Sequence, residues 1–73
     1  MAADWKSVFS SHIDEVGYDY ETRTLMVRWP SGAETHYFDV PYEKAKAVWN
    51  APSVGVELHR SIRGQHDFRT VKP

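Results

Sequence analysis

The chain has 73 residues, no cysteine and a formal net charge of −1. A chain this short has room for one hydrophobic core and one site, and the lack of cysteine excludes disulfides and thiolate metal sites. Hydrophobic residues make up 41% of the sequence and aromatic residues 14%. Because rings bury much apolar area per residue, we expect a folded domain rather than a disordered chain.

Residues 1–9 predict an N-terminal arm with a short helix. Trp5, Val8 and Phe9 follow the i, i+3, i+4 spacing of one apolar helical face, and Asp4 is placed to cap that helix. Two interpretations stay open. The rings either close over the edge of a sheet as part of the core, or they stand exposed and anchor a partner, as large rings often do. The second interpretation makes Trp5 and Phe9 candidate partner-binding residues.

Three extended segments follow, joined by short turns. Asp19 to Arg23 form a polar turn, and Pro30-Ser31-Gly32 predict a tight one, because proline presets one backbone angle and glycine permits a positive one. Short connections between strands favour an antiparallel meander. In the last segment the rings of Tyr37 and Phe38 alternate between opposite faces. The predicted strands are residues 16–19, 24–29 and 34–40.

Two helices are expected after the strands. Pro41 suits the first turn of a helix, and Asp39 just before it is a candidate cap. Ser53 is placed to cap a second, shorter helix that runs to about Arg60. The residues with inward-facing helical spacing are Tyr42, Ala45, Val48 and Trp49 in the first helix, and Val54 and Leu58 in the second.

The predicted fold class is therefore α+β, with a three-stranded antiparallel meander packed against one main helix and a second short helix. The expected organisation is an arm at residues 1–9, a domain at 10–69 and a tail at 70–73. Ile62, Phe68 and Val71 are candidate packing residues near the C-terminus.

Charge is unevenly distributed along the chain. Residues 1–43 carry three basic and eight acidic side chains, whereas residues 44–73 carry six basic and two acidic ones. A basic C-terminal part fits either nucleic acid or an acidic protein surface. The near-neutral total favours a protein, because neutralisation of phosphates supplies most of the affinity for nucleic acid.

The most prominent surface feature is a basic cluster made of His59, Arg60, Arg63, His66, Arg69 and Lys72. The cluster is either a solvated face, with an arginine paired to Asp67 or Glu57, or a docking patch for carboxylates or phosphates, which the guanidinium fork binds well. A second, acidic group offers a face for basic partners or a polar strand edge that resists aggregation; it contains Asp14, Glu15, Asp19 and Glu21. From the basic cluster we select His59, Arg60, Arg63 and Arg69 as candidate partner-binding residues.

No motif predicts catalysis or a cofactor. The four histidines show no HxxxH or HxH spacing, so no metal site is expected. Ser10, His12 and Asp14 lack the elbow, oxyanion hole and pocket of a hydrolase, and no glycine-rich phosphate loop is present. We therefore expect a binding protein without enzymatic activity and without cofactors.

Four short segments follow one another in a specific order and spacing: Ile13 with Val16-Gly17-Tyr18-Asp19, Ser31-Gly32, Tyr37-Phe38-Asp39-Val40-Pro41 and Ile62-Arg63-Gly64. In these segments the chain resembles the KTSC domain family, a module appended to some lysyl-tRNA synthetases. The resemblance covers roughly residues 10–69 and implies a small sheet-plus-helix fold without enzymatic activity, with RNA binding indicated by the synthetase context. Two features depart from the family pattern: Thr35 replaces the first ring of a Tyr-x-Tyr motif, and Glu57-Leu58 replaces paired aromatics.

Three functions follow from these observations. The first is a regulator that binds a bacterial RNA polymerase subunit and modulates or inhibits transcription, because the chain also resembles, in length, a phage-encoded regulator of host polymerase. The second is an RNA- or tRNA-binding module that uses the arginines, with Tyr37 or Trp29 stacking on bases. The third is an adaptor for another protein. No transmembrane run or signal peptide is recognisable, so we expect a cytoplasmic monomer.

Overall fold

The computed structural model describes residues 3–7 and 13–71. Within these residues none of the helices is long and apolar enough to cross a membrane. Among the described residues, four strands come first, two helices follow and a last strand ends the order. In chain order the elements are β1 (Ala3–Ser7), β2 (Glu15–Asp19), β3 (Thr24–Arg28), β4 (Glu34–Tyr37), α1 (Tyr42–Asn50), α2 (Val54–Ser61) and β5 (Phe68–Val71).

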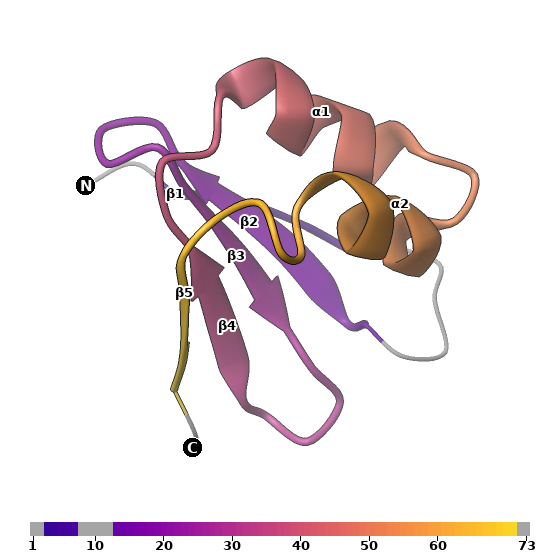
Figure 1. The fold of residues 1–73 in the computed structure, drawn as a ribbon. Helices are drawn as coiled ribbons and strands as arrows, with labels where there is room; N and C mark the ends of the chain where they lie inside the picture. Colours follow the sequence, from indigo (N-terminus) through magenta and orange to yellow (C-terminus); the bar gives the residue numbers. More distant parts are fainter. Residues whose placement is uncertain (1–2, 8–12, 72–73) are drawn as a thin grey trace.

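The strands form one antiparallel sheet in the order β1-β2-β3-β4-β5, and both helices lie on one side of it (Figure 1). The α+β class and the meander β2-β3-β4 are confirmed, but the prediction of three strands is wrong, because β1 and β5 extend the sheet at its two edges. All four residues of β5 are exposed, so this strand lacks the alternation of buried and exposed residues from which a strand is recognised in a sequence.

The helix predicted near the N-terminus is also wrong, because residues 3–7 pair with β2 as a strand. Trp5 lies opposite Gly17, and a Cβ atom at Gly17 would stand 2.7 Å from the indole ring. The guanidinium of Arg28 also lies over the indole ring, with its carbon 4.2 Å from the ring centroid. The half-buried Trp5 therefore packs on the sheet, held by contacts that no helical spacing reveals, while Val8 and Phe9 lie outside the described residues.

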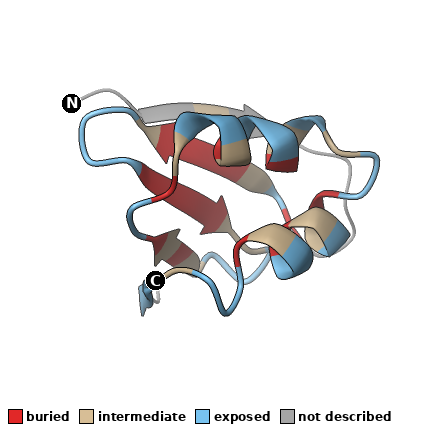
Figure 2. Cartoon of the chain, turned by 45° about the horizontal axis from the view of Figure 1, so that its top comes forward, coloured by how far each residue is buried: buried red, intermediate tan, exposed pale blue. Residues whose placement is uncertain are grey.

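The core lies between the sheet and the helices, where the inward-facing side chains of β2, β3 and β4 are buried (Figure 2). The predicted inward residues Ala45, Val48, Val54 and Leu58 are buried, as is Ile62 just after α2. Tyr42 remains exposed and Trp49 is half-buried. Together with the buried Tyr18, these two rings form a group of edge-to-face contacts, which stabilises α1 on the sheet.

Val40 fixes the connection between the sheet and α1. Its N–H donates to the carbonyl of Arg23 at 2.8 Å, and its carbonyl accepts from the hydroxyl of Tyr18 at 2.6 Å. The predicted cap from Asp39 is wrong, because α1 begins after Pro41 without a side-chain cap and Asp39 adopts a positive φ of 57°. The cap of α2 is confirmed: Ser53 Oγ accepts from the N–H of Val56 at 3.4 Å.

The contact between Trp5 and Gly17 predicts that Gly17→Ala destabilises the protein by about 1–2 kcal/mol, because the added methyl displaces the ring. Urea unfolding measures the loss. Gly55→Ala is the matched control: it has open space around the new Cβ, and alanine is the better helix former. In a Trp5→Ala background the cost of Gly17→Ala should disappear, and a cost that persists there would contradict the proposed clash.

The buried hydroxyl of Tyr18 predicts that Tyr18→Phe costs about 1–3 kcal/mol, because the carbonyl of Val40 loses the one hydrogen bond that the described residues give it. Tyr42→Phe is the control, since its ring is exposed and its hydroxyl bonds to none of the described residues. Thermal or urea unfolding measures both changes. Equal stability of the two variants would show that the buried bond contributes nothing.

Candidate functional site

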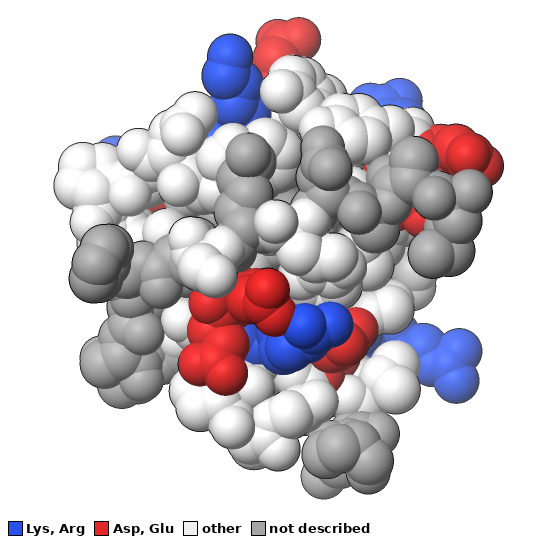
Figure 3. Space-filling view, turned by 180° about the vertical axis from the view of Figure 1, so that it is seen from behind, with Lys and Arg blue, Asp and Glu red and all other residues white. Residues whose placement is uncertain are grey.

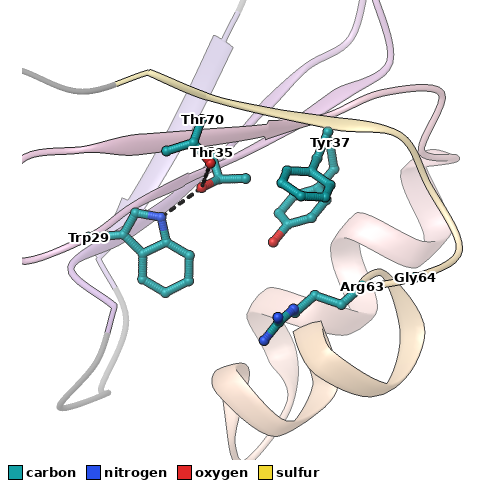
Figure 4. Close-up of a pocket in the computed structure, with 7 residues that line it drawn as sticks. Trp29, Thr35, Tyr37, Arg63, Gly64 and Thr70 are labelled. Carbon is teal, nitrogen blue, oxygen red and sulfur yellow. Dashed lines mark hydrogen bonds between the residues drawn. The ribbon is translucent and has the colours of Figure 1, made fainter.

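A groove opens on the helix side of the sheet, between β4, β5 and the turn that follows α2 (Figure 4). Its volume is about 420 Å³. Thr35 pairs with Thr70 and Tyr37 with Phe68 in the antiparallel register, so these four side chains share one face. We call this hollow the β4–β5 groove; it is lined by Trp29, Thr35, Tyr37, Arg63, Gly64, Phe68 and Thr70.

The chain path after α2 places Arg63 at the groove. Ile62 is fully buried and ends the helix, with its N–H bonded to the carbonyl of Leu58. Gly64 follows with a φ of 81°, a conformation that glycine adopts without strain and that reverses the chain toward β5. The buried Ile62 thus anchors the turn, and Arg63 extends from it toward the sheet.

One wall of the groove is held by hydrogen bonds within the protein. The indole N–H of Trp29 donates to Thr35 Oγ1 at 2.8 Å, and the hydroxyls of Thr35 and Thr70 lie 3.2 Å apart. These three polar side chains therefore satisfy one another. The bond between Thr35 and Thr70 also ties the edge strand β5 to β4.

The other two polar groups of the groove, the hydroxyl of Tyr37 and the guanidinium of Arg63, make no hydrogen bond with Trp29, Thr35 or Thr70. Tyr37 is 4% exposed, and its hydroxyl makes no hydrogen bond with the described residues. Burial raises the pKa of Tyr37, and the positive charge of Arg63 offsets part of that rise, so the hydroxyl stays protonated at neutral pH. Figure 4 shows this hydroxyl and the guanidinium of Arg63 directed into the same hollow.

Arg63 has no carboxylate partner within the described part of the chain. Its Nη1 lies 3.5 Å from Nδ1 of His59, one turn earlier. The predicted acidic partners do not reach it: Glu57 accepts from the hydroxyl of Ser61, and Asp67 forms no ion pair with any described arginine. Most of the donor capacity of this guanidinium is available to a ligand.

The predicted basic cluster does not form one surface. His59 and Arg63 lie together, and Arg60 is exposed on α2. Arg69, however, pairs with His36 in the register and lies on the opposite face of the sheet from the groove. His66 contacts Lys44 Nζ at 3.2 Å, and Lys72 lies outside the described residues. The alternation of side chains along β5 separates Arg69 from the others, which contradicts a single patch.

The opposite face of the sheet carries a second hollow of about 580 Å³, lined in part by Trp5, Met26, Arg28 and His36. Seen from behind, acidic and basic side chains gather there (Figure 3). Arg28 pairs with Glu15 and, at 3.1 Å, with Glu34. The guanidinium of Arg28 is therefore engaged by two carboxylates within the protein and is not open to a ligand.

The predicted acidic group is divided as well. Glu15 is held in the ion pair with Arg28, and Asp19 accepts the backbone N–H groups of Glu21 at 2.9 Å and Thr22 at 3.3 Å. Asp14 is exposed. Two of these carboxylates thus stabilise the sheet and its first turn.

Metal binding has no geometric basis in the residues that the structure describes. No group of three or more His, Asp or Glu side chains converges among them. His36, His59 and His66 lie on β4, on α2 and in the turn before β5. His12 lies outside the described residues.

Comparison with known proteins identifies the family. The sequence model of the KTSC domain matches residues 9–66 of this chain. The chain belongs to the KTSC domain family. A solved KTSC domain protein from Yersinia pestis has the same fold: the TM-score is 0.88 at 27% sequence identity, over 96% of this chain and 99% of that one.

Several curated relatives are longer proteins that match this chain over a small part of their own length. A lysine–tRNA ligase of Trichormus variabilis is 36% identical over 58 residues, and one of Nostoc punctiforme is 34% identical over 58 residues. These matches cover 80% of this chain but only 10% of each ligase. A protein of Stutzerimonas stutzeri, named only as uncharacterized, is 37% identical over 78% of this chain and 80% of its own length.

The groove brings together residues that the sequence analysis had listed separately. Tyr37 and Arg63-Gly64 belong to two of the segments that carry the KTSC resemblance, and Trp29 was considered as a stacking ring. Thr70 was not singled out, and Phe68, expected to pack, is 62% exposed. Both helices separate β4 from β5 in the sequence. No local sequence pattern therefore predicts that these two strands pair.

The Glu34 network predicts a loss of stability in acid. A hydrogen bond from His36 and the charge of Arg28 hold the pKa of Glu34 below its ordinary value of 4.5. A carboxylate whose pKa is lower in the folded state stabilises the fold above its unfolded pKa and loses this contribution as the pH falls. The difference in unfolding free energy between wild type and Glu34→Gln should therefore shrink below about pH 4.5. Glu43→Gln, exposed on α1, is the control; a constant difference for Glu34→Gln would contradict the role of the network.

Proposed function

We propose that this KTSC domain is a non-enzymatic protein-binding module whose contact site is the β4–β5 groove. The observation that supports this function is the open donor pair of Arg63 and Tyr37 beside the ring of Phe68, which is 62% exposed. An exposed ring next to a guanidinium is a typical hot-spot composition in protein interfaces. Trp5, selected earlier as an anchor, packs on the other face of the sheet and is not part of this site.

The charge distribution favours a protein over RNA. Binding to a nucleic-acid backbone needs several phosphate contacts, and the groove offers one open guanidinium. Arg28 is neutralised by two glutamates, and Arg69 lies on the far face. Tyr37, at 4% exposure, presents too little ring surface for a base to stack on.

The partner that we propose first is a subunit of bacterial RNA polymerase, with modulation of transcription as the consequence. The resemblance in length to a phage-encoded polymerase regulator and the mixed charge of the chain support this choice. Occupying a subunit surface requires no chemistry from the module, only shape and charge complementarity.

Site-specific photo-cross-linking tests this function. A photoreactive residue at Phe68 should capture a protein from bacterial lysate and a subunit from purified RNA polymerase. The same residue at Val56, which is 60% exposed on α2 and does not line the groove, should capture neither. Arg63→Ala should lower the yield from position 68, whereas Arg60→Ala should not. Equal capture from both positions would contradict the groove as the site, and capture without any polymerase subunit would reject that partner.

RNA is the second candidate, because the lysine–tRNA ligases among the relatives carry a similar 58-residue region. This proposal predicts a mobility shift with tRNA at low salt and an affinity that falls steeply as the salt concentration rises. Arg63→Ala should weaken the shift for all sequences alike. No shift at low salt would reject RNA as the ligand.

A further inference from the structure

We infer that the β4–β5 groove recognises an acidic side chain, Asp or Glu, that has an apolar residue two positions away in an extended segment of the partner. The inference rests on the proposed protein-binding function and specifies its ligand. The carboxylate would be received by the guanidinium of Arg63 and the hydroxyl of Tyr37, and the apolar residue would pack on Phe68.

Some polar groups of the groove are already hydrogen-bonded within the protein and others are open, and the open ones determine where a carboxylate would bind. Trp29, Thr35 and Thr70 already bond to one another, so their side chains offer little to a ligand. Tyr37 and Arg63 are directed into the same hollow (Figure 4) and have donors to spare. A carboxylate is acceptor-only and takes two donors at once, which is what a guanidinium fork and a neighbouring hydroxyl present.

The apolar part of the groove lies beside these donors. The ring of Phe68 stands 5.8 Å from that of Tyr37, tilted by 41°, and covers the Tyr37 ring while remaining 62% exposed itself. The volume of about 420 Å³ is near the lower end of ligand pockets. It therefore has room for an acidic side chain and one apolar side chain, but not for a folded element.

A carboxylate fits the local charge better than a phosphate does. A phosphate monoester carries nearly two negative charges at neutral pH, and the groove presents one guanidinium. Lys44, the nearest basic side chain on α1, bonds to the carbonyl of Ser61 at 3.3 Å and to Gln65 at 3.1 Å. One positive charge and one neutral donor match a single negative charge.

The edge position of β5 favours a side chain in mid-segment over a chain terminus. β5 is the last strand of the sheet, so none of the described strands pairs with its other edge. An extended segment that runs past such an edge presents alternate side chains to the groove and continues beyond it. The acidic side chain would enter as one of these alternate residues.

Peptide titration by NMR tests the inference. The probe is a blocked pentapeptide with a central Phe-Ala-Glu sequence, which places the ring and the carboxylate on one face of an extended chain, and the matched control carries Phe-Ala-Gln. The Glu peptide should shift the Arg63 Nε–H and Gly64 amide signals and should bind at least about tenfold more tightly than the Gln peptide, as expected for a charge-assisted hydrogen-bond pair. Two further probes replace the glutamate by phosphoserine or end in a free C-terminal carboxylate.

Variants assign the contact to the two donors. Arg63→Ala should lower the affinity for the Glu peptide by about tenfold or more, and Tyr37→Phe should lower it by roughly threefold to tenfold. Arg63→Lys, which keeps the charge and loses the fork, should recover only part of the affinity. Arg60→Ala and Arg69→Ala, which alter arginines outside the groove, should bind as the wild type does. Unchanged backbone spectra away from the groove show that each variant is folded.

The outcomes separate the ligand from the function. Equal binding of the Glu and Gln peptides at the groove would overturn the carboxylate while leaving protein binding there intact. Tighter binding of the phosphoserine or free-terminus probe would overturn the acidic side chain as the ligand, as would the absence of any shift with all four peptides. Cross-linking from position 68 decides protein binding independently of every peptide result.

Discussion

The hydrogen bond between the buried hydroxyl of Tyr18 and the carbonyl of Val40 fixes the chain where it passes from the sheet to the helices. It joins the middle of β2 to the connection that leads from β4 into α1. Val40 is fully buried and is also bonded through its N–H to the turn after β2. The chain is thus fixed at the point where it leaves the sheet, and the direction of α1 follows from it. A chain without disulfides depends on such fixed points, because few residues are available to build a core.

The position of the groove follows from the same constraint. α1 packs on β2 and on α2, and α2 ends at the buried Ile62. Arg63 and Gly64 come next, so their distance from β4 is set by the two helices and not by the turn itself. Functional donors placed by packed helices are held more precisely than donors on a free loop. The position of the groove residues therefore depends on packing outside the groove.

The sequence predicted the elements whose signal is local. Alternation identified β3, where Leu25 and Val27 face the core, and helical spacing with a serine cap identified α2. The edges were missed for physical reasons. Trp5 packs against Gly17, which has no side chain, and against the guanidinium of Arg28. Both contacts join segments that are distant in the sequence. β5 is a strand because β4 offers it a partner, and its own residues are all exposed. For the same reason Arg69 was grouped with Arg63, although the pleat of β5 directs Arg69 to the face of the sheet opposite the groove that Arg63 lines.

The two walls of the groove differ in how firmly they are held. The side made by Trp29 and Thr35 belongs to the packed sheet and is cross-linked by hydrogen bonds. The side made by β5 is a four-residue edge strand with no buried residue, and segments with few buried contacts open at low free-energy cost. The groove therefore has one wall of fixed shape and one wall that costs less free energy to displace. An adaptable wall of this kind accommodates side chains of different bulk better than a fully packed wall does.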